Sequence, residues 1–473
     1  MNPDPVIRSR FPLQLTLPDL SSLSISSVAP LFSLAAAGQM LVRLTGPRVL
    51  WAVLAVAVPF VLSSTIFRLL NRHFPNAGAS YHWSRRVLGP TASRFQSWIL
   101  LMAYFWSLPP IVIPAATQTL ALAGLPRPAP PAVVLAGAGW VAFATGVLLL
   151  GSRVTARVTQ AFLVLEVAAV AVLAAVGLAR WHPVAAPAGP LPLRPFAVAM
   201  VVAATIVDGW EIDSYAAEEA RRPRTTPGTG GMAGALLVLA YYGLAWTVLL
   251  HTVPVPVLAA HSDVLTTWAA AELPGAGRWA LLPILASTAG SLWLTTFILS
   301  RALYAMGRDR LLPAPLTRLN RFHAPVWAIA LPAAGALAVV AVNLAWPSVT
   351  ALFNLVLSSA GFFLVLEFLF DSVTAAVFLA RQHPASWPHA RDRHRHRGLL
   401  VVSVVTSLWL AGIAGLFLRY GGAAVGPGLD AVLAVLLGGG TLFSILAARR
   451  QRSAGACFIF EPEAPGPEPV PPL

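Results

Sequence analysis

The chain has 473 residues, of which 57% are apolar and 11% are charged, and its formal net charge is +14. A soluble domain carries roughly 25% charged residues, so this chain lacks the polar surface that a soluble fold needs, and a soluble enzyme domain is excluded. Its apolar residues fall in long blocks such as 49–65, 134–150 and 399–417, and about 20 of them in a row suffice to cross a bilayer as a helix. We therefore predict an all-α integral membrane protein.

About twelve transmembrane helices are predicted from apolar windows bounded by arginine, proline and glycine clusters. In chain order the predicted spans are 21–42, 48–70, 95–123, 132–151, 158–179, 196–217, 231–254, 279–306, 325–345, 350–379, 399–419 and 428–448. The cytoplasmic N-terminal segment 1–20 is broken by prolines and lacks the compact apolar core of a signal peptide. The tail 449–473 is rich in proline and is predicted to be disordered.

The distribution of arginine predicts the orientation. The chain contains no lysine, so all 32 basic residues other than histidine are arginines. Seven of them fall in the odd-numbered gaps between spans, namely Arg43, Arg48, Arg127, Arg180, Arg194, Arg278 and Arg419. The others gather in the even-numbered gaps, at span ends and near the termini, and the positive-inside rule places that side in the cytoplasm. Both termini are therefore predicted to be cytoplasmic, and the arginine clusters are interpreted as topology determinants rather than nucleic-acid sites.

The basic cytoplasmic loop 381–398 contains the densest of these clusters, from Arg391 to Arg397. We interpret this run as a solvated loop, with a contact to anionic lipids as the alternative.

Five carboxylates lie inside the predicted spans, where ionisable groups are costly and tend to be functional. They are Glu166, Asp208, Glu211, Glu367 and Asp371. Asp208 and Glu211 belong to the cluster Asp-Gly-Trp-Glu in the middle of the sixth span, and Gly209 weakens the helix there. Secondary transporters bind their substrates at interrupted helices near the membrane midplane, so we predict that the sixth span is broken near 204–209.

The first span is predicted to be interrupted as well. It contains Ser26 and Ser27, whose hydroxyls can bond to freed backbone groups, and then Pro30, which cannot donate to a helix turn. The first and sixth spans are five apart, so breaks at matching positions indicate two related five-helix units and a transporter.

Three motifs then occur in order along the chain. The segment 74–83 reads FPNAGASYHW and leads into Leu-Gly-Pro at 88–90. Gly209-Trp210-Glu211 is followed by Glu218-Glu219 and by Arg-Pro-Arg at 222–224. The segment 300–309 reads SRALYAMGRD, with Ala-Pro-Val at 324–326. Together the motifs resemble those of the amino acid–polyamine–organocation (APC) superfamily permeases after the second helix, in the sixth helix and from the end of the eighth helix onward.

The resemblance implies a LeuT-like fold of two inverted five-helix repeats, here 21–179 and 196–380, followed by two C-terminal helices within 399–448. It also implies alternating access, with an α-amino acid or related organic amine bound at helices 1 and 6. The chain departs from the family in three places. Asp208 stands just before the sixth-helix glycine, where many members have an aromatic or a small residue. A serine-containing segment replaces the glycine-rich break of helix 1, and Glu166 lies in the fifth helix, where some proton-coupled members have a lysine.

The predicted substrate site combines the two breaks. It consists of Ser26, Ser27, Pro30, Ala204, Thr205, Asp208, Gly209 and Trp210. The substrate carboxylate is expected at the amides near Ser26 and Ser27, at the positive end of the half-helix after the break. The ammonium group is expected at the carbonyls near Ala204 and Thr205.

Four side chains have more specific expected roles. Asp208 is expected to pair with a cationic substrate, which favours amines or basic amino acids. Trp210 either caps the site as an aromatic gate or packs against a neighbouring helix. Glu166 and Glu211 are the candidates for proton exchange, because burial disfavours the charged form of a carboxyl group. For Glu211 the alternative is a structural hydrogen bond to freed backbone.

The predicted function is a secondary active transporter of an amino acid or related organic amine in the plasma membrane, coupled to H⁺ or working by exchange. The alternatives are a sodium-coupled carrier, for which Thr295 and Thr296 offer hydroxyls, and a non-transporting sensor. No enzyme, cofactor or metal site is expected, because the sequence has no HExxH, P-loop or nucleophile elbow. The expected partners are the solute and the lipid bilayer. A nucleic acid is not expected, nor is a disulfide-linked subunit, because the single cysteine, Cys457, lies in the tail.

Overall fold

The computed structural model describes residues 9–452 apart from 184–190, 262, 276, 343–348, 383–389 and 427. The predictions for the tail beyond residue 452, including Cys457, and for residues 383–389 of the loop 381–398 fall outside these residues. The prediction that the run from Arg391 to Arg397 is a loop was wrong, because this run belongs to the helix Ala390–Val425 and continues the apolar span that follows it. Within the described part the chain is helical, and its β pairing is limited to two isolated bridges, Leu15 with Ala220 and Leu319 with Pro325.

The first half of the chain forms seven α-helices and one 3-10 turn. They are α1 (Leu17–Val28), α2 (Pro30–Thr45), η1 (Gly46–Arg48), α3 (Val49–His73), α4 (Ala79–Val87), α5 (Pro90–Leu122), α6 (Pro130–Leu149) and α7 (Ser152–Ala179). Three of these helices begin with a proline, at Pro30, Pro90 and Pro130. Proline suits that position because its N–H would have no partner there and its φ is already helical.

The described residues of the second half form ten α-helices and two 3-10 turns. They are α8 (Leu193–Val207), α9 (Ile212–Tyr215), η2 (Ala217–Glu219), α10 (Thr229–Thr252), α11 (Val255–Ala260), α12 (Val264–Glu272), α13 (Leu281–Arg308), η3 (Ala314–Thr317), α14 (Val326–Val342), α15 (Val349–Ala380), α16 (Ala390–Val425) and α17 (Gly428–Arg452).

Each predicted span falls on one or more helices of the described chain, although α7 and α16 extend well beyond the spans predicted for them. The first and sixth spans are each divided into two helices. Nine helical segments of the described chain are long and apolar enough to cross a membrane. The first of these, Leu17–His73, runs through α1, α2 and α3, while α8 and α14 are shorter apolar helices. The sequence analysis did not predict α4, α11 and α12, because helices of six to nine residues are too short to register as spans. The protein is thus a multi-pass membrane protein.

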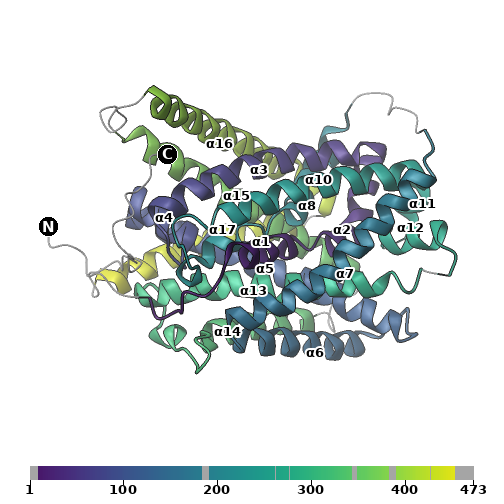
Figure 1. Cartoon of the computed structure of the whole chain (residues 1–473), viewed down its shortest axis with the longest axis horizontal. Coiled ribbons are helices and arrows are strands. Elements are labelled where there is room, and N and C mark those ends of the chain that lie inside the picture. Colours follow the sequence, from purple (N-terminus) through teal and green to yellow (C-terminus); the bar gives the residue numbers. More distant parts are fainter. Residues whose placement is uncertain are drawn as a thin grey trace.

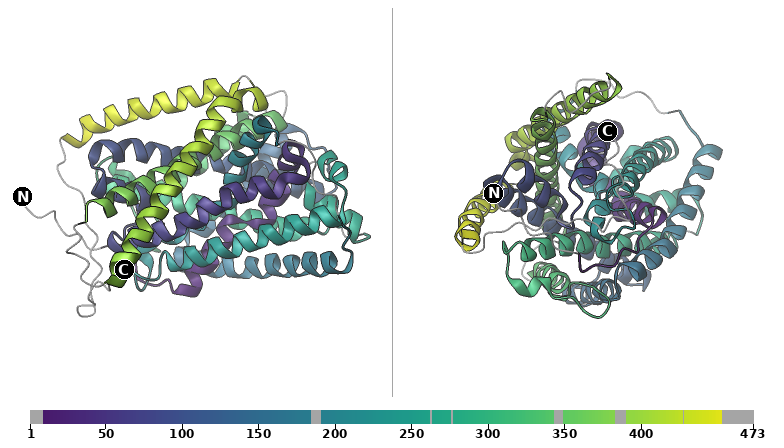
Figure 2. Two further views of the ribbon diagram at one scale, coloured as in Figure 1. Left: turned by 90° about the horizontal axis from the view of Figure 1, so that it is seen from above. Right: turned by 60° about the vertical axis from the view of Figure 1, so that its left-hand side comes forward.

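The long helices run along the long axis of the molecule and form one bundle (Figure 1 and Figure 2). α13 lies inside it, since 89% of its apolar window is buried, compared with 17% for α7 and for α17. α13 packs against α5, α7 and the α1/α2 pair. The most enclosed helix of the bundle is therefore a neighbour of the first interrupted one.

The first break lies at Ala29. This residue has a left-handed φ of 48° between the end of α1 and the start of α2. The sequence analysis expected the positive half-helix end near Ser26 and Ser27, and this placement was wrong: both serines lie in the last turn of α1. The reason is Pro30, which occupies the first position of α2 and so makes the new helix begin there.

The second break follows Val207, where α8 ends. Asp208 is extended, Gly209 has a φ of 106°, and helical structure resumes at Ile212. The predicted interruption of the sixth span is confirmed.

Candidate functional site

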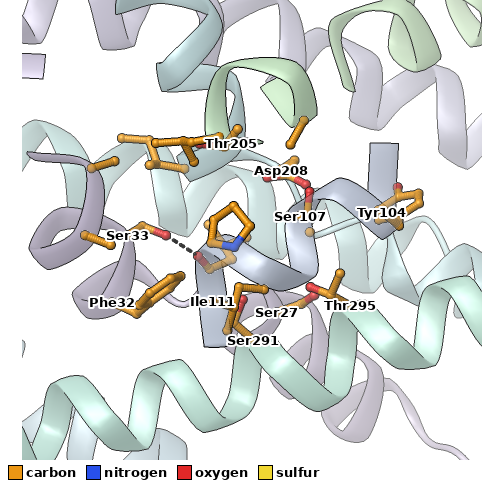
Figure 3. A pocket seen from close by; sticks show the side chains of 18 of the residues that line it. Ser27, Phe32, Ser33, Tyr104, Ser107, Ile111, Thr205, Asp208, Ser291 and Thr295 are labelled. Carbon is orange, nitrogen blue, oxygen red and sulfur yellow. Dashed lines mark hydrogen bonds between the residues drawn. The ribbon is translucent and has the colours of Figure 1, made fainter. Parts of the chain in front are cut away.

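A cavity, the central cavity below, lies beside the two breaks and is lined by residues of α1, α2, α5, α8, α13 and α15 (Figure 3). Its polar lining consists of Ser27, Ser33, Tyr104, Ser107, Thr205, Asp208, Ser291 and Thr295. Its apolar lining includes Val28, Phe32, Ile111, Ile206, Ile298 and Leu357. The volume open to a water-sized sphere is about 40 Å³, which is room for roughly three waters. Small-molecule sites combine an apolar lining with a few polar groups in the same way.

The two breaks touch each other at Gly209. A β-carbon on this residue would lie 2.9 Å from both the carbonyl carbon and the carbonyl oxygen of Ser27, and 3.0 Å from the Val28 nitrogen. The φ of Gly209 also lies where residues with a side chain are rare. Across the first break, the Ser33 hydroxyl donates to the Val28 carbonyl oxygen at 2.9 Å (Figure 3). Close backbone contact thus joins the interrupted helices beside the cavity.

Glu211 holds the second break. Its carboxylate accepts the Gly209 N–H at 2.9 and 3.0 Å and the Tyr104 hydroxyl at 2.9 Å. The Glu211 side chain is fully buried. It therefore makes the structural bond to freed backbone that the sequence analysis gave as the alternative, while its role in proton exchange stays a prediction.

Asp208 is the one acidic residue among the described residues that line the cavity, and none of them is basic. Its own N–H continues the last turn of α8 by donating to the Ala204 carbonyl oxygen at 3.2 Å. Its side chain lies in the cavity wall, close to Ser107 and Thr205 (Figure 3). A carboxylate in such a cavity favours a positively charged group, since Coulomb attraction is strong where water is scarce.

Glu166 lies outside the cavity lining and bridges α1, α7 and α13. Its two carboxylate oxygens accept hydrogen bonds from Ser287 Oγ at 2.9 Å and from Ser26 Oγ at 3.4 Å. The glutamate side chain is buried. Ser26, predicted to contact substrate, instead bonds to the residue predicted to exchange a proton. This contact ties the last turn of α1 to two neighbouring helices.

The structure brings half of the predicted substrate-binding residues to the cavity. Those that line it are Ser27, Thr205, Asp208 and Gly209. Those that lie outside the lining are Ser26, Pro30, Ala204 and Trp210. The Trp210 ring packs edge-on against Phe67 and Phe368, at centroid distances of 5.2 and 5.6 Å. This contact agrees with the packing alternative, while a gating role of Trp210 stays a prediction.

Sequence reasoning missed most of the contributions of α5, α13 and α15. Tyr104 belongs to an aromatic stretch from which one ring could have been expected to line the cavity, and it does. Thr295 also lines the cavity, whereas Thr296 donates to the Leu292 carbonyl oxygen of its own helix at 2.8 Å. Ser291 carried no signal, because a small hydroxyl residue in an apolar helix usually bonds to its own backbone.

Two more buried carboxylates, Glu367 and Asp371, lie one turn apart on α15. The Tyr215 hydroxyl donates to Glu367 Oε1 at 2.7 Å, and the Ser80 hydroxyl donates to Asp371 Oδ2 at 2.7 Å. The rings of Tyr215 and Tyr104 meet edge to face at 5.9 Å. A polar layer therefore extends from the second break to α4, inside an otherwise apolar bundle.

The three sequence motifs meet in buried contacts. Glu218 accepts the two terminal nitrogens of Arg308 at 2.7 and 2.8 Å and the Ala77 N–H at 3.0 Å. Glu219 accepts the Arg301 Nε at 2.9 Å. Burial raises the pKa of Glu218, but the Arg308 charge and hydrogen bonds lower it by more, so that the net pKa lies below its usual value. These ion pairs fix the segment after the second break to α13.

The apolar bundle, the abutting breaks and the cavity between them are the features of a membrane permease. A sequence model of the amino acid permease family matches residues 15–439, so the chain belongs to that family. The branched-chain amino acid permease BcaP of Lactococcus lactis subsp. cremoris (strain MG1363) is 24% identical over 345 residues, which cover 67% of this chain and 74% of the relative. The predicted membership of the APC superfamily is confirmed.

Proposed function

We propose that the protein is a secondary active transporter that moves an amino acid across the plasma membrane by alternating access. The observation that carries this proposal is the cavity between the abutting breaks, because interrupted helices free backbone groups to bind a substrate at membrane depth. The family of the chain supports the same conclusion. The fold proposed with it has twelve crossings, with inverted repeats at 21–179 and 196–380.

For recognition, we place the ammonium group of the substrate at Asp208, next to the carbonyl end of α8, where the helix dipole is negative. We place the carboxylate of the substrate at the amino end of α2, directly after Ala29, where the helix dipole is positive. Ser27 and Thr205 line the space between these two ends. In this arrangement the ammonium group and the carboxylate of an α-amino acid each face a group of opposite charge or partial charge.

For the substrate side chain, an aliphatic group is our first candidate. Phe32, Ile111 and Leu357 give the cavity an apolar surface. A charged substrate side chain would lose its hydration against this surface, which costs free energy. The similarity to a branched-chain amino acid permease supports this choice. Organic amines and basic amino acids are the second candidate, because Asp208 can also bind a positive charge on a side chain.

The size of the cavity supports alternating access. A space for roughly three waters is too small for a branched amino acid, so binding requires the surrounding helices to move apart. The breaks at Ala29 and Gly209 divide each interrupted helix into two segments. Such element ends absorb the backbone rotations of hinge motions.

Coupling to protons or exchange is part of the proposal. Glu166 is held by single serine hydroxyls from α1 and α13. Gain or loss of a proton on Glu166 changes which of these groups donates, and hence how α1 packs at the break. Glu211 stands in the same relation to the second break through Gly209.

The test is uptake of labelled leucine, arginine and putrescine into vesicles that contain the purified protein, with and without an imposed pH gradient. We expect saturable leucine uptake, increased by the gradient. Asp208→Asn should lower it roughly 10- to 100-fold, because a hydrogen bond to a charged group is worth about 1.5–3 kcal/mol. Asp430→Asn, the same change at an exposed site on α17, is the control. If the protein moves none of the three solutes, the transporter proposal is refuted. If Asp208→Asn leaves the kinetics of leucine uptake unchanged, the assigned binding mode is refuted.

We also propose that both termini face the cytoplasm, because the arginine-rich gaps lie on their side of the membrane. In intact cells a membrane-impermeant maleimide should therefore fail to label Cys457 until the membrane is permeabilised. Labelling before permeabilisation would show that the C-terminus faces the outside and would refute the proposed orientation.

A further inference from the structure

A pocket lined by three arginines lies where α3, α10 and α16 meet. Arg68 and Arg72 come from α3 and Arg395 comes from α16. The two α3 residues are one turn apart, so they lie on the same face of the helix. The pocket has a volume of about 340 Å³ and shares no described lining residue with the central cavity. It is a separate site.

One wall of this arginine pocket is apolar. Leu69, Met232 and Leu399 belong to the lining together with the arginines. Along the chain, Arg68 is the first charged residue of α3, and Arg395 lies just before the apolar run of α16 that begins at Leu399. Both helices therefore change from apolar to basic at the pocket, as transmembrane helices do at the level of the lipid headgroups.

Two glycines shape the pocket. A β-carbon on Gly228, whose φ is 74°, would lie 2.5 Å from the Cα atom of Arg68. The turn before α10 therefore packs directly on the α3 backbone and fixes the position of Arg68. A β-carbon on Gly398, in contrast, would meet nothing within 4 Å. The α3 side of the pocket is therefore closely packed against the turn before α10, whereas the α16 side has open space beside Gly398.

We propose that the arginine pocket binds the phosphate group of an anionic phospholipid, with an acyl chain of the lipid against Leu69, Met232 and Leu399. Guanidinium groups are the preferred partners of phosphate, and basic pockets between transmembrane helices suit lipid headgroups. A free phosphate ion would gain nothing from the apolar wall. Topology alone requires basic residues on this side but does not require arginines of two helices to converge on one pocket.

The proposed lipid site has a consequence for the interrupted helix. α3 and α16 both pack against α8, which ends at the second break. A lipid bound between α3 and α16 adds contacts to two helices that hold α8 in place. The site is independent of the transport proposal, because binding is measured without any substrate.

The experiment uses the full-length protein purified in detergent, with lipid retention measured by native mass spectrometry and the melting temperature measured in parallel. The probes are phosphatidylglycerol, phosphatidylcholine and inorganic phosphate. We expect retention of phosphatidylglycerol and a higher melting temperature with it alone. Since each arginine near the surface contributes about fivefold to the affinity for anionic lipid, Arg68→Gln/Arg72→Gln should weaken binding on the order of 25-fold.

Two further variants separate the pocket from the general charge of this face. Gly398→Leu fills the open side while it keeps all three arginines and improves the helix propensity, so it should also abolish retention. Arg397→Gln removes one exposed charge of the same helix outside the pocket and should leave binding within about fivefold.

The outcomes are distinct. Equal stabilisation by inorganic phosphate would make this an anion site and would overturn the lipid proposal. Equal retention of phosphatidylcholine, or unchanged phosphatidylglycerol binding in Gly398→Leu, would overturn it as well. If the double arginine variant does not fold, the result with Gly398→Leu decides.

Discussion

Replacement of Gly209 by alanine tests the contact between the two breaks. The φ of 106° is unfavourable for alanine by about 1–3 kcal/mol. The new methyl group would also lie 2.9 Å from the Ser27 carbonyl carbon and oxygen. Both are backbone atoms that cannot rotate away, and overpacking of this kind costs roughly 1–3 kcal/mol. We therefore expect Gly209→Ala to destabilise the protein by about 2–6 kcal/mol in total.

The assay is the melting temperature of the purified protein in detergent, with leucine uptake measured on the same preparations. Gly139→Ala in α6 is the matched control, because its β-carbon would meet nothing within 4 Å and alanine in a helix is favoured by about 0.5–1 kcal/mol. We expect a clear loss of melting temperature for Gly209→Ala and none for the control. Equal melting temperatures for the two variants would show that the breaks are not in contact at Gly209.

Two other substitutions probe the buried polar contacts. Glu218→Gln should lower the free energy of unfolding by about 3–5 kcal/mol, because it leaves the Arg308 guanidinium buried without its counter-ion. Denaturation experiments measure this loss, with Glu218→Asp as the milder control. A loss below about 1 kcal/mol would contradict a buried ion pair. The pKa of Glu218 is lowered in the folded protein. Its contribution to stability is therefore complete above the usual pKa of a glutamate, declines below that pKa, and is lost once the pH has fallen through the lowered pKa. Tyr104→Phe removes the hydroxyl that donates to Glu211 and should cost about 1–3 kcal/mol. Ser107→Ala is the control, because the Ser107 hydroxyl donates to Ala103 of its own helix. An equal melting temperature for these two variants would show that Tyr104 does not stabilise the second break.

The local features of the fold were readable from the sequence because each depends on a short segment. A membrane helix is defined by its own apolar residues, so the apolar core of each long helix could be located, although the ends of some helices, such as α16, lie up to nine residues outside the predicted span. Pro30 and Gly209 act on their own backbone, so both interruptions were predictable, although the first was placed two to three residues too early. The cost of a charge in the membrane identified Asp208 and Glu211 before any packing was known.

The tertiary structure decided which of these residues meet. Trp210 and Asp208 are close neighbours in the sequence, yet the turn at Gly209 sends the tryptophan to Phe67 and Phe368 and the aspartate to the cavity. The pairing of Glu218 with Arg308 joins residues 90 positions apart. Such contacts depend on how whole helices pack, because the direction of a side chain is set by the helix that carries it and its partner by the neighbouring helix. The sequence by itself therefore determined the long apolar helices, the two breaks and the family, and only the packed bundle decided which side chains line the cavity.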